Sequence, residues 1–155
     1  MIKTLCILTL ALFVMSTAGA AATTTSTSGK IVVVTHLSQI NNALQNEPVF
    51  LRLGASWCPH CKAFQPTFEA LAKEYAGKVT FMSIDITNSP TLAKYFGVKH
   101  IPDCSVIVSI KNGKYIYMQQ NGKTTTDRSQ AQIIREKHPK SVYEKLLNFA
   151  IKYKK

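Results

Sequence analysis

The chain has few acidic side chains and no apolar stretch long enough to cross a membrane. Its 155 residues carry 19 lysines and arginines but only 8 aspartates and glutamates, a formal net charge of +11. The apolar run at residues 5–15 is shorter than the roughly 20 residues of a membrane-spanning helix. No basic stretch is interleaved with aromatic side chains, so we expect no nucleic-acid partner. The charge serves solubility or, alternatively, steers acidic proteins or anionic envelope components towards the surface.

The amino-terminal residues 1–22 have the pattern of a secretory signal peptide. Lys3 precedes the apolar run, and the small residues 18–22 follow it. This order suits a cleaved signal, and the alternative is an uncleaved amphiphilic anchor. We expect cleavage, and therefore an exported protein, periplasmic or secreted, with no stable membrane insertion. Residues 23–29 are small and hydroxylated, which predicts a flexible linker.

Cysteine is also scarce. Cys6 lies in the predicted leader, so the exported chain keeps Cys58, Cys61 and Cys104. Three is an odd number, and the first two are too close in sequence to close a loop of structural value. A redox or metal-binding role therefore explains this C-x-x-C pair better than a structural disulfide does.

Hydrophobic patterning from residue 30 onward predicts strands that alternate with helices. Continuous apolar runs predict buried strands, and segments with helical spacing that close on glycine predict helices. The predicted strands are 31–37, 49–55, 79–85, 104–110 and 114–120, and the predicted helices are 38–44, 61–78, 90–97 and 140–155. Asn112-Gly113 joins the last two strands in a hairpin. This order implies an α/β fold in which helices flank a central mixed β-sheet on both faces.

The carboxyl-terminal part carries more chain than this fold needs. Residues 123–139 form an extra segment, in which Asp127 and Gln130 indicate a capped helix over 127–137. The last helix should pack through one apolar face. Its predicted members are Val142, Leu146, Phe149, Ala150 and Tyr153.

The motifs together resemble the thioredoxin-like family. The matching positions are Ala55, Trp57, the two cysteines, Lys62, Pro66, 73-KEYAGK-78, Ile84-Asp85, 97-GVKHIP-102, 111-KNG-113 and Gly122. They cover about residues 30–122 in the family's order. The resemblance implies a thioredoxin fold for residues 30–155. It also implies a monomeric thiol-disulfide oxidoreductase that exchanges a Cys58–Cys61 disulfide with protein thiols and an unidentified redox partner, without metal or other cofactor.

Helix geometry supports Cys58 as the attacking thiol. A strand leads into a helix at this point, so Cys58 would be the N-cap and Pro59 the first helical residue. Unpaired amide groups and the positive end of the helix dipole then face its sulfur and favour the thiolate. Protonated His60 would add a second positive charge. Cys61 follows one turn later, close enough to resolve a mixed disulfide.

The dipeptide between the cysteines implies a direction of exchange. Reducing thioredoxins usually carry glycine-proline, whereas the proline-histidine found here is similar to periplasmic enzymes that introduce disulfides. An exported oxidase or isomerase is therefore expected. Only 16 residues separate Asp85 from Pro102, which leaves no room for the helical insertion of those enzymes. The alternative is a thioredoxin-fold module that binds a metal or a partner without redox turnover.

The resemblance also implies a substrate site opposite the cysteines. Trp57, Ile101 and Pro102 occupy the matching positions, with a cis peptide bond before the proline. An extended substrate segment would pair with the backbone of Ile101. The alternative is an ordinary trans-proline that opens a strand.

Two positions depart from the family pattern. Where the family has a buried aspartate six residues before the first cysteine, this chain has Arg52, and where a lysine often partners that aspartate it has Phe81. Proton transfer at Cys61 then relies on water, His60 or an unidentified carboxylate. Arg52 either stabilises a thiolate or extends to the surface.

Cys104 lies two residues beyond Pro102, at the start of a predicted strand. A small buried core residue is the favoured interpretation. The alternatives are a third thiol within reach of the pair and a metal ligand.

Overall fold

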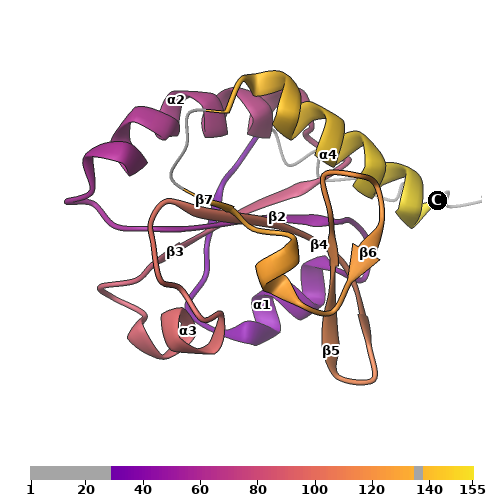
Figure 1. Cartoon of the computed structure of the whole chain (residues 1–155), viewed down its shortest axis with the longest axis horizontal. Helices are drawn as coiled ribbons and strands as arrows, with labels where there is room; N and C mark the ends of the chain where they lie inside the picture. The colour runs from indigo at the N-terminus through magenta and orange to yellow at the C-terminus, as the bar shows by residue number, and fades with distance from the viewer. Residues whose placement is uncertain (1–28, 135–137) are drawn as a thin grey trace, which may run out of the picture.

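A mixed β-sheet runs through the centre of the computed structural model, which describes residues 29–134 and 138–155 (Figure 1). The strand order is β1-β3-β2-β4-β5-β6, and β7 pairs with β4 beside this path. The strands are β1 (Val32–Val33), β2 (Val49–Gly54), β3 (Thr80–Asp85), β4 (Asp103–Lys111), β5 (Lys114–Met118), β6 (Thr124–Thr125) and β7 (Ile133–Ile134). β3 runs parallel to β1 and β2, whereas β4 is antiparallel to β2 and β5. The predicted mixed sheet is confirmed.

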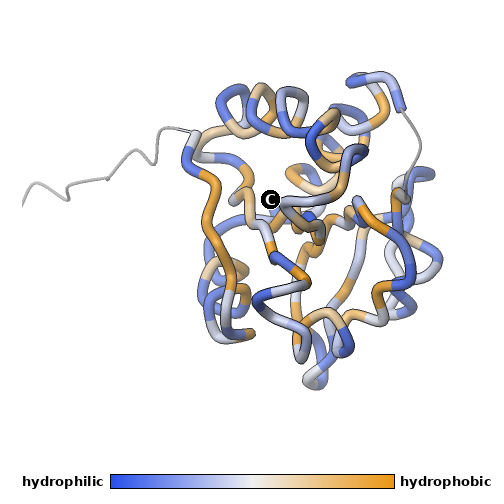
Figure 2. Tube along the Cα trace, turned by 90° about the vertical axis from the view of Figure 1, so that its left-hand side faces the viewer, coloured by the Kyte–Doolittle hydropathy of each residue, from blue (hydrophilic) through white to orange (hydrophobic). Residues whose placement is uncertain are grey.

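Helices cover both faces of this sheet, as predicted. The helices are α1 (Leu37–Ala43), α2 (Pro59–Glu74), α3 (Pro90–Tyr95) and α4 (Lys140–Lys154), with a 3₁₀-turn η1 (Arg128–Gln130). In Figure 1, α2 and α4 lie above the sheet and α1 and α3 lie below it. Two separate buried clusters result, one containing Leu71 and Leu146 and the other containing Ile40 and Leu92. Figure 2 shows apolar stretches that alternate with hydrophilic ones along the chain, one of them at the edge of the domain where the described chain begins.

Aromatic rings fill the cluster beneath α2 and α4. Phe50 contacts Phe68 and Phe81 edge-on, with ring centroids 5.4 and 5.2 Å apart. Such pairs add about 0.5–1.5 kcal/mol beyond the burial of their area. Phe81 therefore serves the core of this protein.

The first predicted strand is largely wrong. Only Val32–Val33 pairs, at the edge of the sheet, and the side chain of Val33 is 63% exposed. A run of β-branched residues indicates a strand but does not distinguish an edge from a centre. The next helix begins at Leu37, one residue earlier than predicted. His36 is its N-cap and donates its backbone N–H to Gln39 Oε1 at 3.0 Å.

The helix predicted over 127–137 is also wrong within the described residues. Asp127 does act as a cap, since its Oδ1 accepts from Ser129 N at 3.0 Å, but it opens only the short turn η1. The chain then joins the sheet as β7, pairing with Asp103 and Cys104. This part of β4 lies before its pairing with β5 begins at Val106, so its open edge accepts another strand. Residues 135–137 lie outside the described residues.

The last helix packs through a face rotated from the predicted one. Leu146 and Ala150 are buried as predicted, but Tyr153 is 50% exposed. Tyr143 is buried instead, its ring 5.1 Å from that of Phe64 on α2. The described helices include none that is long and apolar enough to cross a membrane. The predicted leader, 1–22, and linker residues 23–28 lie outside the described residues.

Candidate active site

Cys58 stands at the junction of β2 and α2. Its extended backbone (φ −81°, ψ 117°) makes it the N-cap, and Pro59 is the first helical residue, as predicted. Its Sγ accepts the backbone N–H of Cys61 at 3.1 Å, and its thiol lies 3.9 Å from the carbonyl oxygen of Ile101. A helix amide therefore points at the sulfur, which is the arrangement that stabilises a thiolate.

Cys61 is as deeply buried as Cys58, since each side chain is 3% exposed, but its sulfur lies against Gly54 of β2. It is buried on the inner side of α2, and burial, followed by its hydrogen bond with Cys58, raises the pKa of its thiol to about 11. The positive charge of Arg52 acts in the opposite direction and lowers that pKa. At neutral pH, Cys61 is therefore a protonated thiol that needs a proton acceptor before it can attack a disulfide.

A cavity of about 560 Å³, here called the front cavity, opens beside Cys58. It is lined by Trp57, Cys58, Pro59, His60, Ile86, Val98, Lys99, His100 and Ile101, with no acidic residue among them. The Trp57 side chain is 63% exposed and donates Nε1–H to Thr87 Oγ1 at 3.1 Å. The peptide bond between Ile101 and Pro102 is cis, as predicted. The structure thus brings the predicted substrate residues to the mouth of the Cys58 site.

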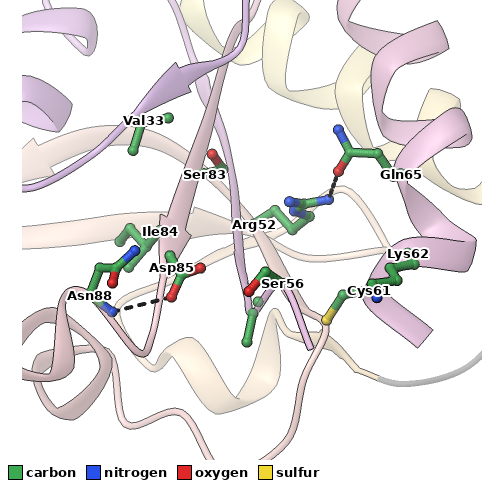
Figure 3. A pocket seen from close by; sticks show the side chains of 12 residues that line it. Val33, Arg52, Ser56, Cys61, Lys62, Gln65, Ser83, Ile84, Asp85 and Asn88 are labelled. Atoms are coloured by element: carbon green, nitrogen blue, oxygen red, sulfur yellow. Dashed lines mark hydrogen bonds between the residues drawn. The ribbon is translucent and has the colours of Figure 1, made fainter. Parts of the chain in front are cut away.

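A second cavity of about 370 Å³, here called the rear cavity, lies behind Cys61 (Figure 3). Side chains of β2, β3 and α2 line it, among them Arg52, Cys61, Gln65 and Asp85. The sheet approaches Cys61 closely here, since a Cβ on Gly54 would lie 3.1 Å from the Cys61 sulfur. Glycine at this position therefore allows the buried thiol to lie against β2.

Arg52 points into the rear cavity instead of reaching the surface. Its Nη1 donates to Gln65 Oε1, and its guanidinium lies over the Phe68 ring, 4.9 Å from the centroid. Its Nε is buried and has no hydrogen-bond partner among the described residues. Its charge lowers the pKa values of Cys61 and of Cys104. The geometry therefore directs its effect to the inner thiol of the pair, and its role in exchange stays a prediction.

Asp85 is a carboxylate at the same cavity. Its Oδ1 accepts the backbone N–H groups of Thr87 at 2.8 Å and Asn88 at 3.2 Å. Asp85 is the register partner of Gly54, so both residues face the same side of the sheet. Asp85 and Cys61 therefore line the same cavity.

Cys104 belongs to the core. It is buried on β4 among the aromatic cluster, and burial raises the pKa of its thiol. The described residues contain no group of three side chains suited to hold a metal ion. These observations favour the core interpretation over a third exchanging thiol.

One buried ion pair next to the site is not among the residues predicted from the sequence. Asp103, which follows Pro102 directly, binds Arg128 of η1 through two hydrogen bonds of 2.9 and 2.7 Å. Burial raises the pKa of Asp103, and Arg128 opposes that rise. Twenty-five positions separate the two residues, so only the unusual placement of a carboxylate at the head of an apolar strand could have indicated a partner.

The family model described as Thioredoxin matches residues 30–135. The chain belongs to the thioredoxin family. It is 35% identical over 72 residues to thioredoxin C-2 of Corynebacterium nephridii, covering 46% of this chain and 64% of that protein. A thioredoxin domain-containing protein of Theileria parva is 28% identical over 92 residues, which cover 59% of this chain and 40% of that protein.

Solved structures of the thioredoxin family superpose over most of the chain. The short form of thioredoxin f from spinach chloroplast is 28% identical with a TM-score of 0.55, covering 82% of this chain and 95% of that one. Mitochondrial thioredoxin 3 from Saccharomyces cerevisiae is 25% identical with a TM-score of 0.54, covering 76% and 93%. By sequence, the chain spans slightly less than two thirds of the curated thioredoxin of Corynebacterium nephridii.

Proposed function

We propose that this protein is a thiol-disulfide oxidoreductase acting on protein thiols and disulfides. The observation that carries the proposal is the Cys58 sulfur at the N-cap of α2, which accepts the Cys61 amide and adjoins the front cavity. Family membership supports the same chemistry.

The exchange takes place in two balanced steps. In the oxidising direction, a substrate thiolate attacks the Cys58 sulfur of the Cys58–Cys61 disulfide, and Cys61 leaves as the thiolate and takes up a proton. A second substrate thiolate then attacks the mixed disulfide, which releases the oxidised substrate and the Cys58 thiolate. In the reducing direction, the Cys58 thiolate attacks a substrate disulfide and releases one substrate thiolate. Cys61 then loses its proton and attacks the Cys58 sulfur of the mixed disulfide, which forms the Cys58–Cys61 disulfide and releases the second substrate thiolate.

Proton transfer at Cys61 needs an acceptor, and Asp85 is the carboxylate that lines the same cavity. It lines the rear cavity together with Cys61, and its Oδ1 is fixed by two backbone amides. Water in the cavity would carry the proton between the thiol and the carboxylate. Arg52 stabilises the thiolate that forms.

The walls of the front cavity support a class of substrate. Trp57, Ile86 and Ile101 offer apolar surface, whereas His60, Lys99 and His100 are basic side chains. An extended segment with apolar and acidic residues beside its cysteine complements these walls. Without the leader 1–22 and its Lys3, the chain keeps 18 lysines and arginines against 8 acidic residues, and this positive charge would attract such partners.

We further propose that the protein is exported and oxidises or isomerises disulfides. The proline-histidine pair and the leader-like residues 1–22 support this direction and location. Stabilisation of the Cys58 thiolate by the helix amide favours the reduced form of the pair, which makes its disulfide a stronger oxidant.

Reactivation of reduced ribonuclease and reduction of insulin test the activity and its direction. The wild type should reactivate ribonuclease faster than it reduces insulin, and a Cys58→Ser variant should do neither. Equal rates for wild type and variant would overturn the enzymatic proposal. Equilibration of the pair with glutathione should give a potential above that of cytosolic reductants, and a value near theirs would overturn the oxidising direction.

Amino-terminal sequencing of the protein from fractionated cells tests the export. The mature chain should begin directly after Ala20 or after Ala22 and should appear in the periplasm or the medium. An intact leader in the cytosolic fraction would contradict the proposal without touching the chemistry of the pair.

A further inference from the structure

The side chain of Arg128 joins the two ends of the loop that forms one wall of the front cavity. Its Nη1 donates both to the carbonyl oxygen of Phe96, at 2.9 Å, and to Asp103 Oδ2, at 2.9 Å. Phe96 is the last residue before the loop 97–102, and Asp103 is the first residue after it. One guanidinium group therefore closes a loop of six residues.

This arrangement is buried and uses most of the donors of the guanidinium. Nη2 donates to Asp103 Oδ1 at 2.7 Å, and Nε donates to Ser105 Oγ at 3.3 Å. Arg128 is 8% exposed and Asp103 is fully buried. Gln132 Nε2 donates to Asp103 Oδ2 at 3.0 Å and satisfies the carboxylate further. A two-pronged, buried pair of this kind fixes orientation as well as distance.

The segment that carries Arg128 is itself attached to the sheet on both sides. Before it, β6 pairs with β5, and after it, β7 pairs with β4 at Asp103 and Cys104. Arg128 thus extends from a supported segment, which lets it hold the loop in place. The extra segment predicted over residues 123–139 thus supplies the side chain that binds both ends of loop 97–102.

The loop held in this way faces the reacting sulfur. Val98, Lys99, His100 and Ile101 line the front cavity, and the carbonyl oxygen of Ile101 lies 3.9 Å from Cys58 Sγ. An extended substrate that pairs with the backbone of Ile101 would place its own sulfur by the position of this loop. Displacement of a reacting atom by about 1 Å can reduce a rate by about a hundred-fold.

We propose that Arg128 is a positioning residue that holds loop 97–102 in register with Cys58 and so sets the efficiency with protein substrates. The proposal rests on the proposed thiol-disulfide exchange. A positioning role for Arg128 can be distinguished from a purely structural role by the choice of substrate. Loss of the Arg128 contacts should impair exchange with an extended peptide much more than exchange with a small thiol, which needs no backbone pairing.

Arg128→Gln and Arg128→Lys, with Lys123→Gln as a control, test this proposal. Lys123 lies in the same segment and its side chain is exposed, so the control removes one positive charge without touching the loop. The probes are a peptide with one cysteine and acidic flanks, and dithiothreitol. For Arg128→Gln we expect KM for the peptide to rise about ten-fold while the dithiothreitol rate changes less than about two-fold. Arg128→Lys keeps the charge but not the two-pronged geometry, so its KM for the peptide should lie between those of the wild type and Arg128→Gln. Lys123→Gln should have the KM of the wild type.

Equal losses with both probes, or no loss with either, would overturn the proposal. Circular dichroism at the assay temperature checks that each variant is folded. If Arg128→Gln unfolds, the double variant Asp103→Asn/Arg128→Gln removes both buried charges, and the same selective loss with the peptide is expected of it. A wild type without exchange activity on either probe would instead contradict the proposed function.

Discussion

The two cavities on either side of the cysteine pair differ in what they offer a sulfur atom. The front cavity presents Cys58 to apolar and basic side chains and to the backbone of loop 97–102. The rear cavity encloses Cys61 with Arg52, Gln65 and Asp85. The front cavity is therefore suited to contact with another molecule, whereas the rear cavity contains charged groups that can take part in proton transfer.

This difference separates the two chemical steps of an exchange. Cys58 adjoins the front cavity, and its sulfur accepts a helix amide, an arrangement that favours a thiolate at a helix N-cap. Cys61 needs to remain protonated until the mixed disulfide forms, and burial raises its pKa to about 11. Changes on the front side should alter encounter with substrates, whereas changes on the rear side should alter the release of the mixed disulfide.

Removal of either sulfur should have the largest effect on exchange, and the effect should differ between Cys58 and Cys61. Cys58→Ser should reduce exchange by about a thousand-fold or more, because the attacking atom is gone. Cys61→Ser should still react once, but it should accumulate mixed disulfides because no thiol resolves them. Non-reducing electrophoresis after incubation with an oxidised substrate separates the outcomes. Trapped adducts in the Cys58→Ser protein would contradict the assignment of the attacking thiol.

Loss of the buried ion pair between Asp103 and Arg128 should lower the free energy of unfolding, and with it the stability of the loop that lines the front cavity. Arg128→Gln leaves Asp103 without its charged partner, which costs about 3–5 kcal/mol in buried pairs. Urea unfolding measures the change in the free energy of unfolding. The double variant Asp103→Asn/Arg128→Gln should recover part of this loss, and equal destabilisation by Lys123→Gln would rule out the pair as the cause.

Asp85→Asn tests proton transfer on the rear side. Asparagine Oδ1 still accepts from the backbone of Thr87 and Asn88, so the local structure should persist. We expect resolution of a mixed disulfide to slow by about a hundred-fold at neutral pH. Stopped-flow kinetics with a preformed mixed disulfide measure this step alone. Unchanged kinetics would exclude Asp85 as the acceptor.

Arg52→Ala should act in the same direction but more weakly. Since the guanidinium lowers the pKa of Cys61, its loss should raise that pKa above about 11. At a given pH below this value the thiolate fraction falls, by about ten-fold for each unit of increase. The pH profile of resolution should therefore move to higher pH. Arg52→Lys, which keeps the charge, should move it less, whereas equal shifts in both variants would indicate a steric cause.

Reversal of charge in the front cavity should give the smallest effect. Lys99→Glu should slow exchange with a peptide of acidic flanks by about three-fold and leave a neutral peptide unaffected, because exposed charges interact weakly in water. Added salt should reduce the difference between the two peptides. An equal effect on both peptides would contradict a role in selecting charge.

Local signals predicted the site better than they predicted the edges of the fold. The N-cap position of Cys58 and the cis bond before Pro102 follow from short patterns and from the family resemblance, and the structure has both. The alternation of apolar runs and helical spacing also predicted β2, β3 and α2. These elements lie at the centre of the sheet, where burial and local pattern agree.

The errors involve pairings between residues far apart in the sequence. Val33 lies at an edge that its own sequence does not reveal, and residues 133–134 join β4 because that strand has an open edge there. The direction of Arg52 depends on Gln65 and Phe68, which belong to another element. No local pattern indicates such contacts, so their prediction requires the assembled sheet.

The close packing of Gly29 against α2 determines where any amino-terminal attachment leaves the domain. Gly29 has φ +57°, and a Cβ here would lie 2.9 Å from the Lys73 side chain and 3.1 Å from its Cα. Lys73 is fifteen positions beyond Cys58 on the same helix, a distance of roughly 22 Å along its axis. A fusion partner or solid support joined ahead of Gly29 would therefore begin well away from the reacting sulfur and leave the front cavity open to a protein of full size.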